Sequence, residues 1–276
     1  MRPMNLWDEL KEVWRYRELL LQLTRRNLRL RYKNSLFGFA WSLITPLAQI
    51  AILAYVLKVM MRHGIPNYSA YLFPVLFAWT FFSVAILDAC SSLIYDAGVV
   101  TKVYFPREIL PLASVLANLI HFGIALVVTF LYLMYHRIFP QQVDVLRVCL
   151  LLPVIVFTEL LLILGLGLIV ACLNVLYEDI KYMVSVVLLL MFYFMPILYP
   201  VEKVPEHLYQ WYMLNPIAAV LVAYQKLLLP PIRIPNMEAL PFPGGYLLAA
   251  LGVSLAVAVG GYLVFNRYKW ELVERL

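Results

Sequence analysis

Charged residues are scarce in this sequence: Asp, Glu, Lys and Arg account for 14% of its 276 residues, whereas hydrophobic residues account for 64%. Soluble domains are about half apolar and about a quarter charged, so this composition excludes an ordinary soluble enzyme or binding domain. The mean hydropathy of +0.83 supports the same conclusion. We therefore predict an integral membrane protein, in which each crossing of the bilayer uses about 20 apolar residues.

The sequence also lacks the motifs of catalytic and metal sites. Its cysteines are odd in number, lie far apart in apolar runs and form no CxxC pair, which excludes a disulfide framework; they are Cys90, Cys149 and Cys172. The four histidines are scattered, without the spacing of metal ligands. There is no GxxxxGKS/T loop for ATP phosphates, no GxSxG elbow and no paired-carboxylate motif. We expect no catalytic residue, metal or cofactor in this chain, and transport or scaffolding rather than catalysis.

Six apolar runs have the length and composition of candidate membrane spans. They lie near Phe37–Met61, Tyr71–Tyr95, Ile109–Tyr135, Val145–Leu173, Tyr182–Tyr199 and Gly245–Phe265. We predict an all-α integral membrane fold, in which residues 35–276 form one transmembrane domain with six transmembrane helices.

A seventh apolar stretch differs from these six because it is short. Pro216–Leu229 has 14 residues and contains Gln225 and Lys226, whereas a span needs about 20 apolar residues. We expect a re-entrant or interfacial helix there, within an outer segment 201–243 that precedes the last span. Asn215 before Pro216 is typical of a helix N-cap followed by a proline in the first turn.

Residues 1–34 precede the first span and are predicted to form a cytoplasmic amphipathic helix on the membrane surface, from Asn5 to Arg31. At 100° per residue, apolar residues gather on one side of this helix and charged residues on the other. Arg17 falls on the apolar side, whereas Leu19 and Leu23 do not, so we expect a break or bend. A helix that packs on a partner protein is the alternative interpretation.

The distribution of Lys and Arg predicts the orientation in the membrane. With six spans and the N-terminus inside, 15 of the 22 Lys and Arg residues lie on the inner side, nine of them in residues 1–34. The positive-inside rule then places both termini in the cytoplasm, for a multi-pass protein of the bacterial cytoplasmic (inner) membrane. We interpret the net charge of +6 as attraction to anionic membrane lipids and not to nucleic acid.

Some residues of the spans are candidates for a conduit. Asp88 and Glu159 lie inside predicted spans, where charge is costly and often functional. They could be structural, line a conduit or relay protons. Aromatic residues cluster toward the predicted outer half, either as an interfacial belt or as ring faces along which sugars could slide; the conduit candidates among them are Trp79, Phe82, Tyr193, Phe194 and Tyr199.

Small residues recur at intervals of four in the last predicted span, at Gly252, Ala256 and Gly260. Such a stripe permits close approach of two helices. Packing within the chain and packing between two subunits are both open, and we favour packing within the chain.

Four local patterns occur in order along the chain. They are RYKNSLFGFAWS at 31–42, KVYFPREILPL at 102–112, NVLYEDI at 174–180, and PILYP at 196–200 followed by Asn215-Pro216. Together they resemble the membrane subunits of ABC-2 polysaccharide and polyol-phosphate exporters, the group that includes O-antigen, capsule and wall teichoic acid exporters. The resemblance runs from about residue 10 to the end. Two departures are Glu178, where the family usually has a base, and the absence of an Arg near Gln225 and Lys226.

The resemblance implies a half-transporter that forms a homodimer and binds two copies of a separate ABC ATPase subunit, which holds ATP and Mg. The implied cargo is an undecaprenyl-diphosphate-linked cell-surface glycan of the wall teichoic acid or O-antigen type. The implied ATPase-coupling residues are Lys102, Tyr104, Phe105, Pro106, Arg107 and Glu108. The N-terminal helix would contact the ATPase and gate the access of lipid headgroups, with Arg25, Arg26, Arg29, Arg31 and Lys33 as the bases near the membrane.

Three other functions are compatible with parts of the sequence. An ABC-2 exporter of a small molecule or drug would have the same fold with a different cargo. An integral membrane transferase would need a cluster of His and Asp, or a pair of acids, at one membrane face. A secondary transporter would use Asp88 and Glu159 and follow a proton gradient instead of ATP.

Overall fold

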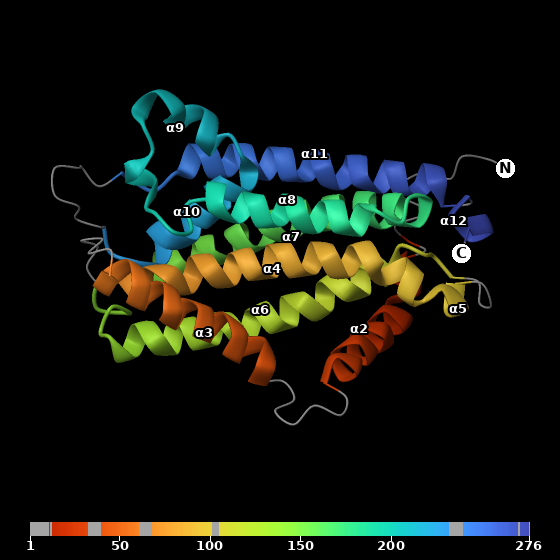
Figure 1. Ribbon diagram of the computed structural model, residues 1–276, viewed down its shortest axis with the longest axis horizontal. Coiled ribbons are helices and arrows are strands. Elements are labelled where there is room, and N and C mark those ends of the chain that lie inside the picture. The colour runs from red at the N-terminus through yellow and green to blue at the C-terminus, as the bar shows by residue number, and fades with distance from the viewer. Residues whose placement is uncertain are drawn as a thin grey trace.

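The computed structural model describes residues 11, 13–32, 40–60, 68–100, 105–231, 240–269 and 271–275, and these residues form helices and connecting segments without a strand (Figure 1). The α-helices are α2 (Arg17–Tyr32), α3 (Trp41–Tyr55), α4 (Tyr68–Tyr95), α5 (Ala97–Val100), α6 (Ile109–Tyr135), α7 (Val145–Leu176), α8 (Ile180–Phe194), α9 (Glu206–Met213), α10 (Pro216–Leu228), α11 (Gly244–Tyr268) and α12 (Glu271–Arg275). A π-helix, η2 (Val56–Met60), continues α3, and a short 3-10 helix, η3 (Val201–Lys203), precedes α9.

Among the described residues, four helices are long and apolar enough to cross a membrane: α4, α6, α7 and α11. The chain is therefore an all-helical membrane protein with several spans. The other apolar helices are shorter, with 15 residues in α3, 15 in α8 and 13 in α10. That α3 and α8 also cross the membrane stays a prediction.

The helix ends differ from the predicted ends where local backbone chemistry decides them. α8 ends at Phe194 and not near Tyr199, because Met195 has an extended backbone and precedes Pro196, and a residue before proline disfavours the helical conformation. The short helix α10 begins as predicted, since the Asn215 side chain accepts a hydrogen bond from the Ile217 amide at 3.2 Å. Residues 37–39, 61 and 232–239 of the predicted segments lie outside the described residues.

The predicted break in the N-terminal helix is confirmed at Tyr16. A turn at this residue separates the helical residues 13–15 from α2. Residues 1–10 and 12 of the predicted helix lie outside the described residues.

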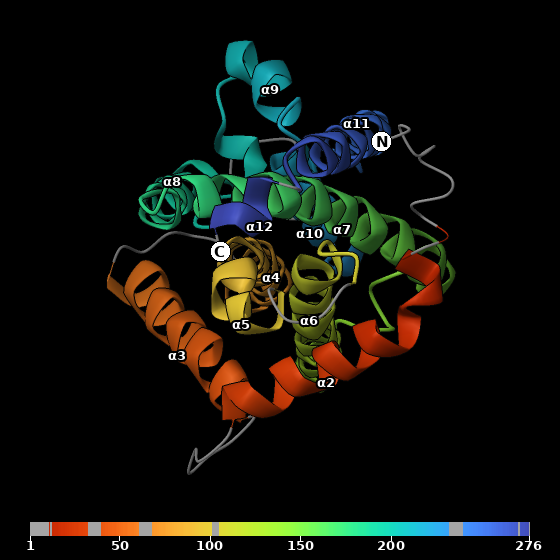
Figure 2. The ribbon, with the colours of Figure 1, turned by 90° about the vertical axis from the view of Figure 1, so that its right-hand side faces the viewer.

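Helix α4 lies near the centre of the bundle, with α7 and α8 on one side and α2 and α3 on the other (Figure 2). It packs against α3, α6, α7, α8 and α10, and 78% of its apolar stretch is buried. The bundle has two ends: α2, α5 and α12 lie at one, called here the α12 end, and α9 lies at the other, the α9 end (Figure 1). The short helix α10 is almost fully buried against α4, α7 and α11.

A close contact between the backbones of α7 and α11 is made through two glycines. A Cβ atom at Gly261 would lie 2.2 Å from the carbonyl oxygen of Gly165, and a Cβ atom at Gly165 would lie 2.4 Å from the carbonyl oxygen of Val257. A Cβ atom at Gly252 or Gly260 would meet nothing within 4 Å. The predicted small-residue stripe is therefore not the contact within the chain. The side of α11 that faces α7 is set by its buried residues, and Gly261 belongs to that side.

We predict that Gly261→Ala and Gly165→Ala each destabilise the protein. Forcing the two backbones apart should cost about 1–3 kcal/mol, which exceeds the roughly 1 kcal/mol by which Ala is favoured over Gly in a helix. Thermal unfolding of the detergent-solubilised full chain, followed by fluorescence-detected size exclusion, measures the change. Gly260→Ala is the matched control, because it makes the same change in the same helix without an overlap. Equal loss of stability at 260 and 261 would contradict the contact.

Candidate functional site

Helix α2 lies across the α12 end of the bundle, mainly against α6 (Figure 2). Leu23 and Thr24 on α2 are buried, and Leu23 belongs to a hydrophobic cluster with Leu93 of α4 and Phe105 of the following segment. Leu21 on the opposite side is 53% exposed. Leu23, which the helical periodicity left off the apolar side, therefore faces the protein together with Thr24. Helix α2 has one apolar surface toward the bundle and another directed away from it.

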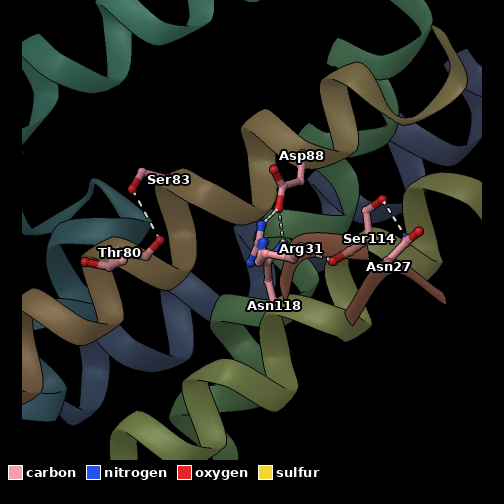
Figure 3. Close-up of polar contacts among 7 residues, drawn as sticks. All are labelled: Asn27, Arg31, Thr80, Ser83, Asp88, Ser114 and Asn118. Atoms are coloured by element: carbon pink, nitrogen blue, oxygen red, sulfur yellow. Dashed lines mark hydrogen bonds and ion pairs between the residues drawn. The ribbon is translucent and has the colours of Figure 1, made fainter. Parts of the chain in front are cut away.

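Arg31 at the end of α2 is held by residues from two other helices (Figure 3). Its Nη2 atom donates to Oδ2 of Asp88 on α4, and its Nη1 atom donates to Oδ1 of Asn118 on α6 at 2.9 Å. Asn118 Nδ2 in turn donates to the same Asp88 oxygen at 2.8 Å. The three side chains form a closed ring of hydrogen bonds. The side chains of Arg31 and Asp88 are 33% and 35% exposed, so this ion pair is open to its surroundings.

A second ion pair and a weaker hydrogen bond hold α2 one turn earlier. Arg26 Nη2 donates to Oδ2 of Asp96, directly after α4. Asn27 Nδ2 donates to the hydroxyl of Ser114 on α6 at 3.5 Å (Figure 3). Asp96 is 16% exposed and so is more enclosed than Asp88. The polar side of α2 is thus bound to the protein and not only to solvent or lipid headgroups.

Two cavities adjoin at Arg31 and His121. The apolar cavity has a volume of about 360 Å³ and lies between α3, α4 and α6. Besides Arg31, its lining residues are Trp41, Thr45, Pro46, Gln49, Phe77, Thr80, Phe81, Val84, Asn118, His121, Phe122 and Ala125. The polar cavity has about 350 Å³ and lies between α2, α4 and α6, and its lining includes Arg26, Asn27, Asp88, Asp96 and Ser114. A region rich in charge therefore continues into a region rich in aromatic carbon.

The predicted headgroup residues divide into two groups in the structure. Arg26 and Arg31 line the cavities, whereas Arg25 and Arg29 are exposed and line neither of these two cavities. Lys33 lies outside the described residues. The polar residues of α6 were missed from the sequence, although Ser114, Asn118 and His121 interrupt an otherwise apolar run at helical spacing and lie on one face.

The predicted coupling segment is attached to the bundle by its second half. Phe105 is 5% exposed and packs in the cluster that contains Leu23. Arg107 Nη1 donates to the carbonyl oxygen of Lys269 at 2.9 Å, just after α11. Glu108 is buried and Pro106 is partly buried. Lys102 and Tyr104 lie outside the described residues.

The aromatic conduit candidates occupy three different environments. Trp79 and Phe82 are 6% and 2% exposed, so the structure places them in the core of the chain, where their ring faces are covered by other side chains. Tyr193 and Phe194 on α8 are 59% and 70% exposed. Of these four candidates, Tyr193 and Phe194 are the pair whose rings lie at the surface of the chain. Sequence could not separate the two pairs, because aromatic content does not tell which way a side chain points.

Tyr199 forms hydrogen bonds that stabilise the chain after α8, at the α9 end. Its hydroxyl donates to the carbonyl oxygen of Phe194 at 2.7 Å, and the Tyr212 hydroxyl donates to the same oxygen at 2.7 Å. The Tyr71 hydroxyl lies 2.8 Å from the carbonyl oxygen of Pro196 and 2.7 Å from that of Tyr199. Burial raises the pKa of Tyr212, which keeps its hydroxyl protonated as a donor. These contacts satisfy the end of α8 and fix the chain that follows it.

Glu159 lies apart from Asp88, inside the bundle. It is fully buried on α7, and its Oε2 atom accepts a hydrogen bond from the Tyr224 hydroxyl of α10 at 2.8 Å. Its other oxygen has no hydrogen-bond partner among the described residues. No group of three or more His, Cys, Asp or Glu side chains in the described part of the chain is placed to hold a metal ion. In this structure Glu159 joins α7 to α10.

Comparison with known proteins gives consistent matches. The sequence profile of one family, described as ABC-2 type transporter, matches residues 18–229. Two relatives from Klebsiella pneumoniae, each named O-antigen export system permease protein RfbA, are 29% identical over 260 residues, which is 94% of this chain and 95% of theirs. A relative of the same name from Myxococcus xanthus is 30% identical over 268 residues, which is 96% of this chain and 98% of its own.

We predict that Tyr224→Phe destabilises the protein by about 1–3 kcal/mol, because it leaves a buried carboxyl group without its donor. Replacing both partners, Tyr224→Phe with Glu159→Leu, should be less destabilising than Tyr224→Phe alone, since no unpaired polar group remains. Thermal unfolding of the purified full chain measures Tyr224→Phe, Glu159→Leu and the double variant, with Tyr135→Phe at an 83% exposed position as the control. A double variant as unstable as the sum of its single variants would refute the pairing.

Proposed function

Because the chain belongs to the ABC-2 type transporter family, we propose that it is the membrane subunit of an ATP-driven exporter that moves a lipid-linked cell-surface glycan across the cytoplasmic membrane. The observation that carries the proposal is the match, over nearly the whole chain, to proteins named O-antigen export system permease. The proposed cargo is an undecaprenyl-diphosphate-linked glycan of the O-antigen or wall teichoic acid type.

In the proposed topology α3 and α8 cross the membrane together with α4, α6, α7 and α11, which makes six spans. Helix α3, with 15 residues, and η2, with 5, run without a break from Trp41 to Met60, which matches the roughly 20 residues that a span requires. Helix α8 is shorter, but the residues that follow it are fixed to the bundle by Tyr71. The bases of α2 favour a cytoplasmic position for the α12 end.

ATP hydrolysis belongs to a separate subunit in this proposal, and two copies of each subunit form the exporter. The coupling segment is 102–108, and its described residues 105–108 lie at the α12 end. Its second half is fixed to the bundle by the burial of Phe105 and by the bond from Arg107 to Lys269. A push on this segment would therefore move the ends of α6 and α11 and not only a loose loop. The ATPase subunit would supply ATP and Mg.

The proposed conduit is formed between two copies of the chain. Helices α3 and α8 expose apolar and aromatic side chains, among them Ile52 and Tyr55 on α3 and Tyr193 and Phe194 on α8. Such surfaces can face lipid or a second copy. Glycan passage would use the exposed ring faces of α8, since Trp79 and Phe82 are covered.

The proposed export is tested in proteoliposomes that contain the chain with its co-purified ATPase and lipid-linked O-antigen. ATP should move glycan into the leaflet reached by an added glycosidase, and a non-hydrolysable ATP analogue should not. The proposal fails if no ATPase co-purifies with the chain, or if transport follows a proton gradient. Stimulation of ATP hydrolysis by small apolar compounds, without stimulation by lipid-linked glycan, would favour a small-molecule exporter.

We predict that Arg107→Ala uncouples hydrolysis from export. Loss of the charged hydrogen bond to the Lys269 carbonyl should lower glycan-stimulated ATP hydrolysis by about tenfold or more, since such bonds contribute about 1.5–3 kcal/mol and 1.4 kcal/mol is a factor of ten. Membrane insertion should be unchanged. Arg267→Ala is the control, because Arg267 is an exposed base in the last turn of α11. Unchanged hydrolysis and export in Arg107→Ala would rule out this role.

A further inference from the structure

The guanidinium of Arg31 lies where the polar and apolar cavities meet, and it is paired with a carboxylate of the same chain. Asp88 accepts from one nitrogen of Arg31, and Asn118 accepts from another at 2.9 Å. A guanidinium binds carboxylate and phosphate oxygens in the same forked geometry. Asp88 therefore holds the position that a phosphate oxygen would take.

The two cavities together match the two parts of a lipid that has an anionic headgroup and an apolar chain. Next to Arg31, the apolar cavity is walled by Phe77, Phe81 and Phe122 and has about 360 Å³. The polar cavity, which Arg31 also lines, has about 350 Å³ and a second base, Arg26. Both volumes lie within the range of ligand pockets, about 300–1,000 Å³. A headgroup at Arg31 would leave its chain beside the aromatic wall.

We propose that Asp88 competes with the phosphate headgroup of the carrier lipid for Arg31, so that the headgroup binds by displacing Asp88. The proposal rests on the proposed function, since it assigns the polyprenyl phosphate part of the exported lipid to this site. While no lipid is bound, the Asp88 carboxylate pairs with Arg31 in place of the phosphate of the headgroup.

The displaced Asp88 loses its ion pair but keeps a hydrogen-bond donor and access to water. Asn118 Nδ2 donates to Asp88 at 2.8 Å, so a displaced Asp88 keeps this hydrogen bond. Both members of the pair are about one third exposed, so separation does not strand a buried charge. The Arg26–Asp96 pair also stays in place and holds α2 on the bundle while Arg31 changes partner.

The exchange would also act on the position of α2. Arg31 lies in the last turn of α2, whereas Leu23 in its middle packs with Phe105 of the coupling segment. Release of Arg31 from Asp88 frees the end of α2 that leads toward α3. Binding of a headgroup is thereby linked to the same helix that the coupling segment contacts.

The test uses the full chain with its ATPase in nanodiscs and measures binding of radiolabelled undecaprenyl phosphate by scintillation proximity. Asp88→Asn should bind about fivefold more tightly than the wild type, which corresponds to about 1 kcal/mol. Asp88→Ser is made in parallel, because it removes the carboxylate with a smaller side chain. Arg31→Gln should bind about tenfold more weakly. The double variant Arg31→Gln with Asp88→Asn should bind no better than Arg31→Gln, since the gain acts through Arg31.

Controls separate the headgroup from other ligands. Undecaprenol, which lacks the phosphate, should bind wild type and Asp88→Asn equally. Glu271→Gln removes the carboxylate of another Arg–carboxylate pair at the same end and should leave binding unchanged. The proposal is overturned if neither Asp88 variant binds more tightly, if inorganic pyrophosphate binds as well as the lipid, or if phosphatidylglycerol competes on equal terms, which would indicate a site for bulk lipid.

Failure of this proposal differs from failure of the proposed export. If the wild-type complex exports glycan and Arg31→Gln binds undecaprenyl phosphate normally, the export stands and the headgroup site is wrong. If the wild-type complex exports no glycan under ATP, the proposed function is wrong whatever the binding of undecaprenyl phosphate.

Discussion

A charge beside apolar helices needs an opposite charge or water, and this requirement determines the structure at the α12 end. Helix α2 brings Arg26 and Arg31, and the end of α4 brings Asp96 and Asp88. Because ionised groups at the edge of hydrocarbon are costly without partners, α2 is stable where its bases meet these two carboxylates. A surface helix with only a few buried residues is thereby held in one place against α4 and α6.

The same pairing connects parts of the chain that lie far apart in sequence. Helix α4 leads through α5 toward the proposed coupling segment, and that segment leads into α6. Phe105 and Leu23 share one hydrophobic cluster with the ends of α7 and α11. The walls of both cavities, the N-terminal helix and the coupling segment are therefore parts of one packed structure. An ATPase that displaced the segment would displace the walls as well.

Sequence predicted what depends on long apolar runs and local chemistry. The helix Ile109–Tyr135 has the predicted ends, Asn215 caps α10 and the N-terminal helix breaks at Tyr16. Contacts between distant residues could not be predicted, because nothing local to Asp88 indicates that Arg31 and Asn118 meet it. For the same reason Trp79 appeared as a conduit residue, although tertiary packing covers it.

The contact of α7 with α11 limits which helices can move relative to one another during transport. The backbones touch at Gly165 and Gly261, with no side chains between them that could slide or change rotamer. These two helices should therefore travel as a rigid body. Helix α3 packs mainly on α4 and continues into the π-helical turn Val56–Met60, a kind of turn that is frequent at functional sites. The width available to a cargo would then be set by how far α2 and α3 move away from the fixed pair of helices α7 and α11.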